Sequence, residues 1–199
     1  MRGISTKEAL TYLGSIKGCI LFVSAMFTLS TLMGYWYSSL NPELATQTFA
    51  EIGELFELIK GLDPLVIMLL IFLNNSIKCL IALSLGIGFG LIPLAFVTYN
   101  GFLIGMTIFI TERTEGLPYI LAALIPHAII ELPMILLSAA IGVKLGHDLL
   151  NTLRGKKVDM KKEFKRGALF YIYWILPLLF IAATVETFVT PLIVAMVVG

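Results

Sequence analysis

Five polar side chains inside long apolar stretches of this chain have the types needed for ion or ligand chemistry. They are Asn75, Lys78, Asn100, His127 and Glu131. Asn75 and Lys78 are three residues apart and His127 and Glu131 are four apart, so each pair shares one face of a helix. Amide, ammonium, imidazole and carboxylate groups inside a membrane are rare and usually mark an ion path, a proton relay or a ligand site. These five residues therefore form the predicted ligand-binding or ion-binding site.

Helix-breaking residues accompany this polar set. Three glycines and Pro93 precede Asn100, while Pro126 and Pro133 flank His127 and Glu131. A proline inside a helix leaves the carbonyl four residues earlier without its donor, and a free carbonyl can bind a cation. We therefore expect the third and fourth membrane helices to be broken or kinked. Broken helices with polar midpoints are typical of transporter sites.

Two interpretations of the polar set remain open from the sequence. Lys78 is the only cation near mid-membrane depth, and Glu131 is the only carboxylate there. The other intramembrane carboxylate, Glu186, comes late in the last apolar stretch, toward the membrane surface. An ion pair between the helices of Lys78 and Glu131 would then be the less costly arrangement. Alternatively, the set only forms hydrogen bonds between helices. Such bonds average well under about 1 kcal/mol and fix how the helices pack.

The composition places these residues in a membrane. The chain has 199 residues, of which 58% are hydrophobic and 14% charged, and its mean hydropathy is +0.95. A soluble domain has about 25% charged residues. Lipid admits only helices and closed barrels, and the apolar runs here are continuous rather than alternating. The sequence predicts an all-α, polytopic bundle that forms one membrane domain over residues 1–199.

Charged boundaries separate five apolar stretches, each longer than the roughly 18–20 residues that cross a bilayer. The predicted spans are about 18–40, 64–85, 87–111, 117–146 and 167–190. The fourth would be about 45 Å long if straight, so we expect it to be steeply tilted or split into a re-entrant piece and a span. Residues 191–199 either fold back into the membrane or extend the fifth span.

The distribution of charge predicts the orientation in the cell membrane. A basic loop at about 147–166 carries seven Lys and Arg residues, whereas the connection after the first span carries five acidic residues and one lysine. Lys and Arg collect on the cytoplasmic side, so we expect the N-terminus and the basic loop there and the C-terminus outside. The acidic connection has the periodicity of an amphipathic outer helix at about 43–62.

The partner expected first is the lipid bilayer, with anionic lipid at the basic loop. Small residues at helical spacing, such as Gly101 and Gly105, allow close packing within the chain or in a homo-oligomer or a complex with another membrane protein. The two cysteines, Cys19 and Cys79, have no metal-binding spacing. We expect no cofactor and no nucleic-acid partner.

The chain resembles the stage II sporulation protein M family, also known as domain of unknown function 95, over about two-thirds of its length. The residues that carry the resemblance are Asn75 to Lys78, Gly86-Ile-Gly88-Phe-Gly90, Asn100-Gly101-Phe-Leu-Ile-Gly105, Pro126-His127-Ala-Ile-Ile-Glu131-Leu-Pro133, Gly142-x-x-x-Gly146 and Glu186-Thr187-Phe188-Val-Thr190-Pro191. The family's namesake acts in a membrane complex with cell-wall-degrading partners, but many relatives belong to organisms that do not sporulate. The resemblance therefore implies a membrane protein with a shared motif, but it does not imply a particular biochemical function.

Three functions compete. A transporter-like protein would bind or move an ion or a small polar or lipid ligand at the polar set. A non-catalytic scaffold would recruit partner proteins through its acidic outer helix or basic loop. An intramembrane metal hydrolase would use His127 and Glu131, but zinc catalysis usually needs three protein ligands and the other histidine, His147, lies near the membrane surface. We expect no enzyme activity.

Overall fold

Five helical segments of this chain are long and apolar enough to cross a membrane, which confirms the predicted all-α class. The computed structural model describes residues 5–57 and 61–198, and no strand occurs among them. The five candidate spans are Thr6–Leu40, Pro64–Ile87, Leu91–Thr114, Leu117–Leu153 and Met160–Val197.

The elements divide as follows, where η1 is a 3₁₀ turn and η2 and η3 are π-helical turns. In chain order they are α1 (Thr6–Leu40), α2 (Pro42–Glu57), α3 (Pro64–Ser84), η1 (Leu85–Ile87), α4 (Leu91–Thr114), α5 (Leu117–Leu153), α6 (Met160–Phe170), η2 (Tyr171–Ile175), α7 (Leu176–Thr184), η3 (Val185–Val189) and α8 (Thr190–Val198). The elements from α6 to α8 make up the fifth span, and α8 continues it past Pro191 instead of folding back.

Local capping explains where several helices begin. Ser5 and Glu8 form a reciprocal capping box, so α1 starts well before the apolar stretch that predicted it. Asp63 caps α3 by accepting a hydrogen bond from the Leu65 N–H at 2.8 Å, and Asp159 caps α6 in the same way. Gly116, with a φ of 86°, separates α4 from α5. Helix ends therefore follow capping groups rather than the limits of hydropathy.

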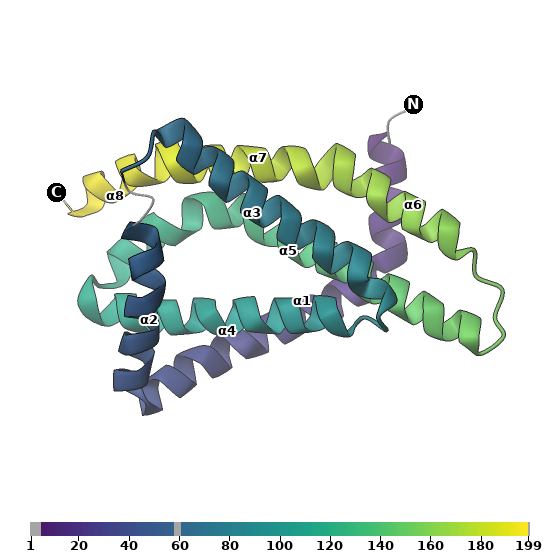
Figure 1. Cartoon of the computed structure of the whole chain (residues 1–199), viewed down its shortest axis with the longest axis horizontal. Helices are drawn as coiled ribbons and strands as arrows, with labels where there is room; N and C mark the ends of the chain where they lie inside the picture. The colour runs from purple at the N-terminus through teal and green to yellow at the C-terminus, as the bar shows by residue number, and fades with distance from the viewer. Residues whose placement is uncertain (1–4, 58–60, 199) are drawn as a thin grey trace.

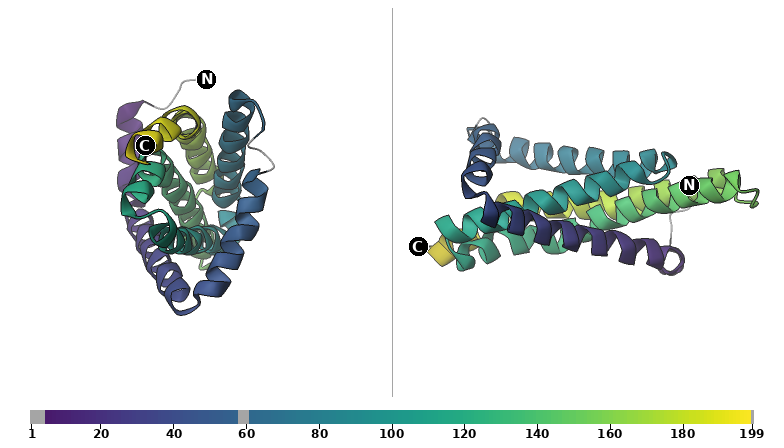
Figure 2. Two further views of the ribbon diagram at one scale, coloured as in Figure 1. Left: turned by 90° about the vertical axis from the view of Figure 1, so that its left-hand side faces the viewer. Right: turned by 90° about the horizontal axis from the view of Figure 1, so that it is seen from below.

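The spans alternate in direction, so the two oppositely charged segments lie at opposite ends (Figure 1). The N-terminus, the α3–α4 turn and the α5–α6 hairpin are at one end. At the other end lie α2, the α4–α5 turn and the C-terminus, as the side views also show (Figure 2). Which end faces the cytoplasm stays a prediction.

The fourth span is one continuous helix of 37 residues, with Pro126 and Pro133 inside it. It is not split into a re-entrant piece and a span. Its first half is bent (Figure 1), as expected where a proline removes a backbone hydrogen bond. The third span, α4, runs without interruption from Leu91 to Thr114, and non-α turns occur instead in the fifth span.

Helices α1 and α4 approach so closely that their backbones touch at glycines. A Cβ added to Gly105 would overlap the backbone carbonyl of Thr31, and one on Gly34 would overlap the carbonyl of Phe102. The Ser30 hydroxyl donates to the Thr98 carbonyl at 2.5 Å across the same contact. This is the close packing that small residues permit between membrane helices.

A second glycine contact joins the α3–α4 turn to α5. A Cβ on Gly86 would overlap the backbone of Gly142, and one on Gly146 would overlap the backbone N of Gly90. Gly90 also has a φ of 76°, which few side chains tolerate. The glycine-rich run after α3 therefore lets the chain reverse while lying directly on α5.

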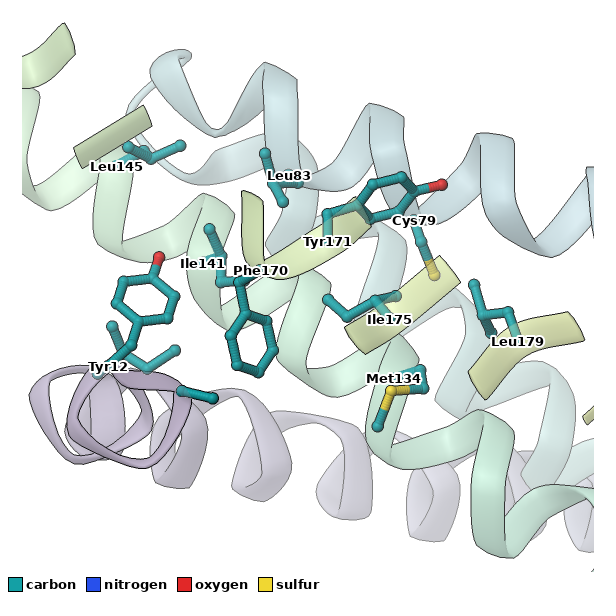
Figure 3. Packing of buried hydrophobic residues seen from close by; sticks show 12 residues of the cluster. Tyr12, Cys79, Leu83, Met134, Ile141, Leu145, Phe170, Tyr171, Ile175 and Leu179 are labelled. Carbon is teal, nitrogen blue, oxygen red and sulfur yellow. The ribbon is translucent and has the colours of Figure 1, made fainter. Parts of the chain in front are cut away.

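The largest buried apolar cluster lies between α1, α3, α5 and the fifth span (Figure 3). Ile141 on α5 is fully buried, and Leu83 on α3 and Ile175 on the fifth span are also fully buried. The ring of Phe170 packs against that of Tyr12 at 5.5 Å. This cluster holds the fifth span against the rest of the bundle.

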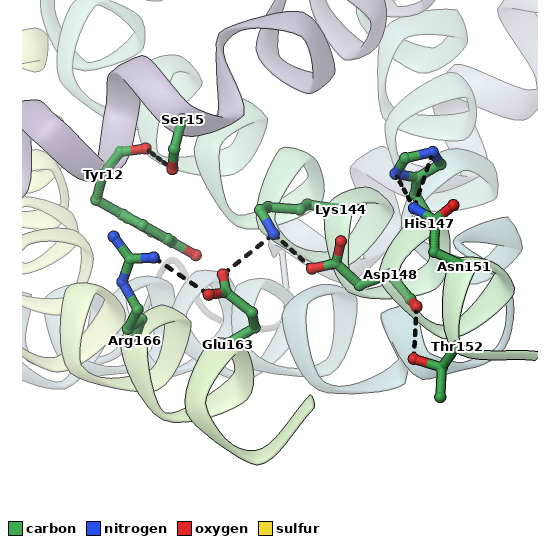
Figure 4. Close-up of polar contacts among 9 residues, drawn as sticks. All are labelled: Tyr12, Ser15, Lys144, His147, Asp148, Asn151, Thr152, Glu163 and Arg166. Carbon is green, nitrogen blue, oxygen red and sulfur yellow. Dashed lines mark hydrogen bonds and ion pairs between the residues drawn. The ribbon is translucent and has the colours of Figure 1, made fainter. Parts of the chain in front are cut away.

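An ionic network fixes the same span at the end that carries the basic loop (Figure 4). Glu163 on α6 pairs with Lys144 on α5 at 3.1 Å and with Arg166 at 3.2 Å, while Lys144 also pairs with Asp148. The Arg166 guanidinium lies 5.0 Å from the centre of the Tyr12 ring on α1. Most of the predicted basic loop is therefore helical, and only residues 154–159 connect α5 to α6.

Helix α2 lies across the opposite end of the bundle (Figure 1). Ala45 is buried there against Met106, Phe109 and Ile110 of α4. Four side chains of the predicted amphipathic face, namely Ile52, Leu55, Phe56 and Ile59, lie outside what the structure describes.

We predict that Gly105→Ala lowers the free energy of unfolding by about 1–3 kcal/mol, because the new methyl group cannot fit against the α1 backbone. Thermal unfolding in detergent, followed through Trp36 and Trp174 fluorescence, measures the change. Gly18→Ala is the matched control, since no atom lies within 4 Å of its added Cβ. Equal melting temperatures for the two variants would contradict the close α1–α4 contact.

We predict that Glu163→Gln lowers the free energy of unfolding by about 1–3 kcal/mol, because Lys144 and Arg166 lose their shared carboxylate. Glu115→Gln makes the same chemical change at an exposed position and should stay within about 0.5 kcal/mol of the wild type. Chemical denaturation in detergent compares the two. A stable Glu163→Gln protein would mean that the network contributes little to folding.

Candidate functional site

A half-buried carboxylate lies within electrostatic range of a second carboxylate and of an exposed lysine, and each of the three comes from a different span. Glu131 on α5 lies within electrostatic range of Glu186 on η3 and of Lys78 on α3. We call these three residues the carboxylate cluster. Lys78 and Glu131 each lie about four turns, or ~21 Å, into a helix from the end of the molecule that holds α2. The cluster is therefore well inside the apolar span.

The predicted ion pair between Lys78 and Glu131 is not a direct contact. The ion pairs between two described residues lie in the network around Glu163, and none of them joins Lys78 to Glu131. Lys78 is exposed on α3, whereas Glu131 and Glu186 are half-buried. The lysine thus acts on Glu131 from a distance, and neither carboxylate has an ion pair with a described residue.

A π-helical turn positions Glu186. In η3 the Thr190 N–H donates to the Val185 carbonyl, five residues back. Pro191, one residue further on, has no N–H, so the usual ladder cannot continue there. The same pattern occurs in η2, where the Leu176 N–H bonds to Tyr171 just before a second proline. Such turns are rare and occur frequently at functional sites.

His127 lies one turn before Glu131 on α5 and is half-buried. Its Nδ1 atom is buried and has no hydrogen-bond partner in the described part of the chain. Thr187, next to Glu186, also has a buried hydroxyl oxygen without a partner. Buried polar atoms usually have partners. These two atoms are therefore free to bind a ligand or water near the carboxylate cluster.

The two predicted asparagines make their hydrogen bonds within their own helices. The Asn100 amide donates to the Phe96 carbonyl at 2.7 Å, and the Asn75 side-chain oxygen accepts from its neighbour Asn74 at 3.2 Å. A short amide side chain readily satisfies a carbonyl one turn back. The structure brings Lys78 and Glu131 into one cluster, but it does not join Asn75 and Asn100 to them by a bond.

The sequence indicated Glu186 only as a late carboxylate and did not pair it with Glu131. The signal that could have found it is the proline spacing in the fifth span. Pro177 and Pro191 each follow a π turn by two residues, and a π turn adds one residue to a helical turn. This extra residue changes which face a later side chain presents.

A cavity of ≈ 360 Å³ lies between α4, α5 and α2. Ile104, Thr107 and Leu124 line it, and Phe49 of α2 covers it. It lies within the size range of small-molecule pockets, which are mostly apolar with few polar groups. His127 is three residues beyond Leu124 on α5, so the cavity ends close to the polar residues.

Metal chemistry lacks a sufficient ligand set in the part of the chain that the structure describes. No group of three or more His, Cys, Asp or Glu side chains there could hold a metal ion. His127 and Glu131 therefore lack, among the described residues, the third protein ligand at metal-binding distance that zinc catalysis usually needs. The metal-hydrolase interpretation gains no support from this geometry.

Comparisons with known proteins identify the family. A model of the stage II sporulation protein M family matches residues 23–191. An uncharacterized protein of the archaeon Methanocaldococcus jannaschii is 31% identical over 172 residues, which cover 83% of this chain and 75% of that protein. A second uncharacterized protein of the same organism is 32% identical over 126 residues, or 60% of this chain and 68% of that protein. No solved structure matches significantly. The match over residues 23–191, together with the five apolar spans, shows that this multi-pass membrane protein belongs to the stage II sporulation protein M family.

Proposed function

We propose that this protein binds a small cation at the carboxylate cluster and moves it across the membrane. The observation that carries the proposal is that Glu131 lies within electrostatic range of Glu186, a second carboxylate from a different span. Two carboxylates in an apolar environment repel each other when both are ionised, and a bound cation or proton relieves the repulsion. Lys78 alone leaves the cluster one negative charge in excess when both carboxylates are ionised.

The surrounding polar atoms support a ligand with a positive charge or a donor group. The Thr187 hydroxyl and the His127 Nδ1 atom are buried without partners and can hold a water molecule or relay a proton. The amides of Asn75 and Asn100 lie on α3 and α4, where they could line the path.

The helices that carry the two carboxylates are suited to local movement. Pro126 and Pro133 bend α5 around Glu131, and η3 widens the helix at Glu186. Residues at such breaks can shift relative to each other without unfolding a whole span. Movement of one carboxylate relative to the other would change the affinity for the cation, and this coupling is what transport requires.

We predict that Glu131→Gln and Glu186→Gln each lower cation flux at least about tenfold. A tenfold change corresponds to the loss of about 1.4 kcal/mol of cation-binding free energy. The assay uses purified protein in liposomes with Na⁺, K⁺ or proton gradients and fluorescent indicators. Glu115→Gln, at the exposed end of α4, is the matched control and should keep wild-type flux.

Equal flux through wild-type and protein-free liposomes for every cation tested would overturn the transport proposal. The absence of a cation-dependent rise in the melting temperature of the wild type would also overturn cation binding. A rise without flux would support binding and exclude transport.

A non-catalytic scaffold is the second candidate, and the surface of the α5–α6 hairpin favours it. Six cations there are exposed and form no ion pair with any residue that the structure describes: Arg154, Lys156, Lys157, Lys161, Lys162 and Lys165. We call them the basic hairpin. They could hold anionic headgroups or an acidic partner at what would be the cytoplasmic end.

We predict that phosphatidylglycerol stabilises the wild type against heat more than phosphatidylcholine does. Each cation near an anionic surface contributes about 1 kcal/mol, so replacing Lys156, Lys157, Lys161 and Lys162 by Gln should remove most of the difference. Melting temperatures in mixed micelles test this. If the fourfold variant keeps the full effect, the lipid binds elsewhere. Cross-linking in native membranes then tests for a protein partner at the same surface.

A further inference from the structure

Helix α3 presents one stripe of side chains to the outside of the bundle. Leu70, Ile77 and Ile81 are exposed by 42%, 53% and 46%, and Asn74 is exposed between Leu70 and Ile77. The spacings of four, three and four residues place all four on one helical face. The opposite face buries Ser76, Cys79 and Leu83 against the bundle. The four stripe residues are apolar apart from Asn74, and the exposed Lys78 borders the stripe one helical turn after Asn74.

Asn74 lies about 15 Å along α3 from Pro64, which is near the middle of the hydrocarbon. Its side chain donates one hydrogen bond, to the Asn75 side-chain oxygen at 3.2 Å. Its own oxygen and its second N–H have no partner among the described residues. Acyl chains offer neither donors nor acceptors, so a polar group facing lipid costs several kcal/mol until it finds a partner.

We propose that this stripe is an interface between two copies of the chain, in which Asn74 of one copy hydrogen-bonds to Asn74 of the other. The chemistry of the amide favours a second copy as the partner. An asparagine carries both an acceptor and donors, so two of them at the same depth satisfy each other. A two-fold axis along the membrane normal brings equal residues to equal depth.

The rest of the stripe fits the same arrangement. Leu70, Ile77 and Ile81 would pack against their copies above and below the amide, while one buried asparagine in an apolar seam fixes register and partner number. Lys78 lies at the edge of this contact, and the attraction of Glu131 in its own chain partly offsets its charge. The interface therefore borders the carboxylate cluster at Lys78, but it needs neither carboxylate, so it can exist whether or not the protein transports cations.

Disulfide cross-linking in liposomes tests the surface. Cys19→Ala removes the half-buried thiol, while Cys79 is fully buried and can stay. In that background Ile77→Cys should form a disulfide-linked dimer on mild oxidation. Leu29→Cys on α1 is the matched control, since Leu29 is 56% exposed, and it should remain monomeric.

The amide is tested by self-association measured as energy transfer between labelled copies at increasing protein-to-lipid ratios. Asn74→Leu should raise the dissociation constant about threefold to tenfold, whereas Asn74→Gln should keep most of the affinity. The melting temperature of Asn74→Leu monomers should not fall, because the residue faces lipid. Unchanged self-association of Asn74→Leu, no Ile77→Cys dimer, or a cross-link to a different membrane protein in native membranes would each overturn the proposal.

Discussion

The arrangement of this bundle depends on backbone contact at glycines. Lipid tails are as apolar as leucine, so membrane helices gain little from burying apolar side chains and rely on close packing. Gly105 and Gly34 let α1 and α4 touch, and Gly86, Gly142 and Gly146 let the α3–α4 turn lie on α5. These contacts orient α4 and α5 relative to α1 and α3. The positions of Lys78 and Glu131 follow from them.

The carboxylate cluster depends on a different feature, the departure of the fifth span from regular α-helix. With regular hydrogen bonding up to Pro191, the carbonyl four residues before that proline would simply lack a donor. The π turn from Val185 to Val189 redistributes these bonds, since Thr190 bonds to Val185 instead. Glu186 lies within this turn and in electrostatic range of Glu131 on α5. The π turn and the two half-buried carboxylates thus belong to one region of the bundle.

Much of the fold could be predicted from the sequence because a membrane constrains it strongly. Hydropathy predicts the five spans, and the alternating direction of successive spans places the acidic α2 at the end opposite the basic hairpin. The helix ends could not be read from hydropathy, since Ser5 and Asp159 extend α1 and α6 into charged sequence. Depth along each span indicated Lys78 and Glu131 as neighbours. Depth alone could not pair Glu131 with Glu186, because a π turn changes the direction of every later side chain. It also gave no sign that the Asn100 side chain hydrogen-bonds within its own helix.

The ionic network at Glu163 holds one end of the fifth span. Ion pairs to Lys144 and Arg166 and the stacking of Arg166 on Tyr12 anchor the start of this span to α5 and α1. Between that anchor and Glu186 lies one π turn, and Glu186 itself lies in the second. The span is therefore anchored where it begins, and its regular hydrogen bonding is interrupted twice further along. Glu186 lies at the second interruption, so this carboxylate belongs to an irregular segment and not to the anchored end.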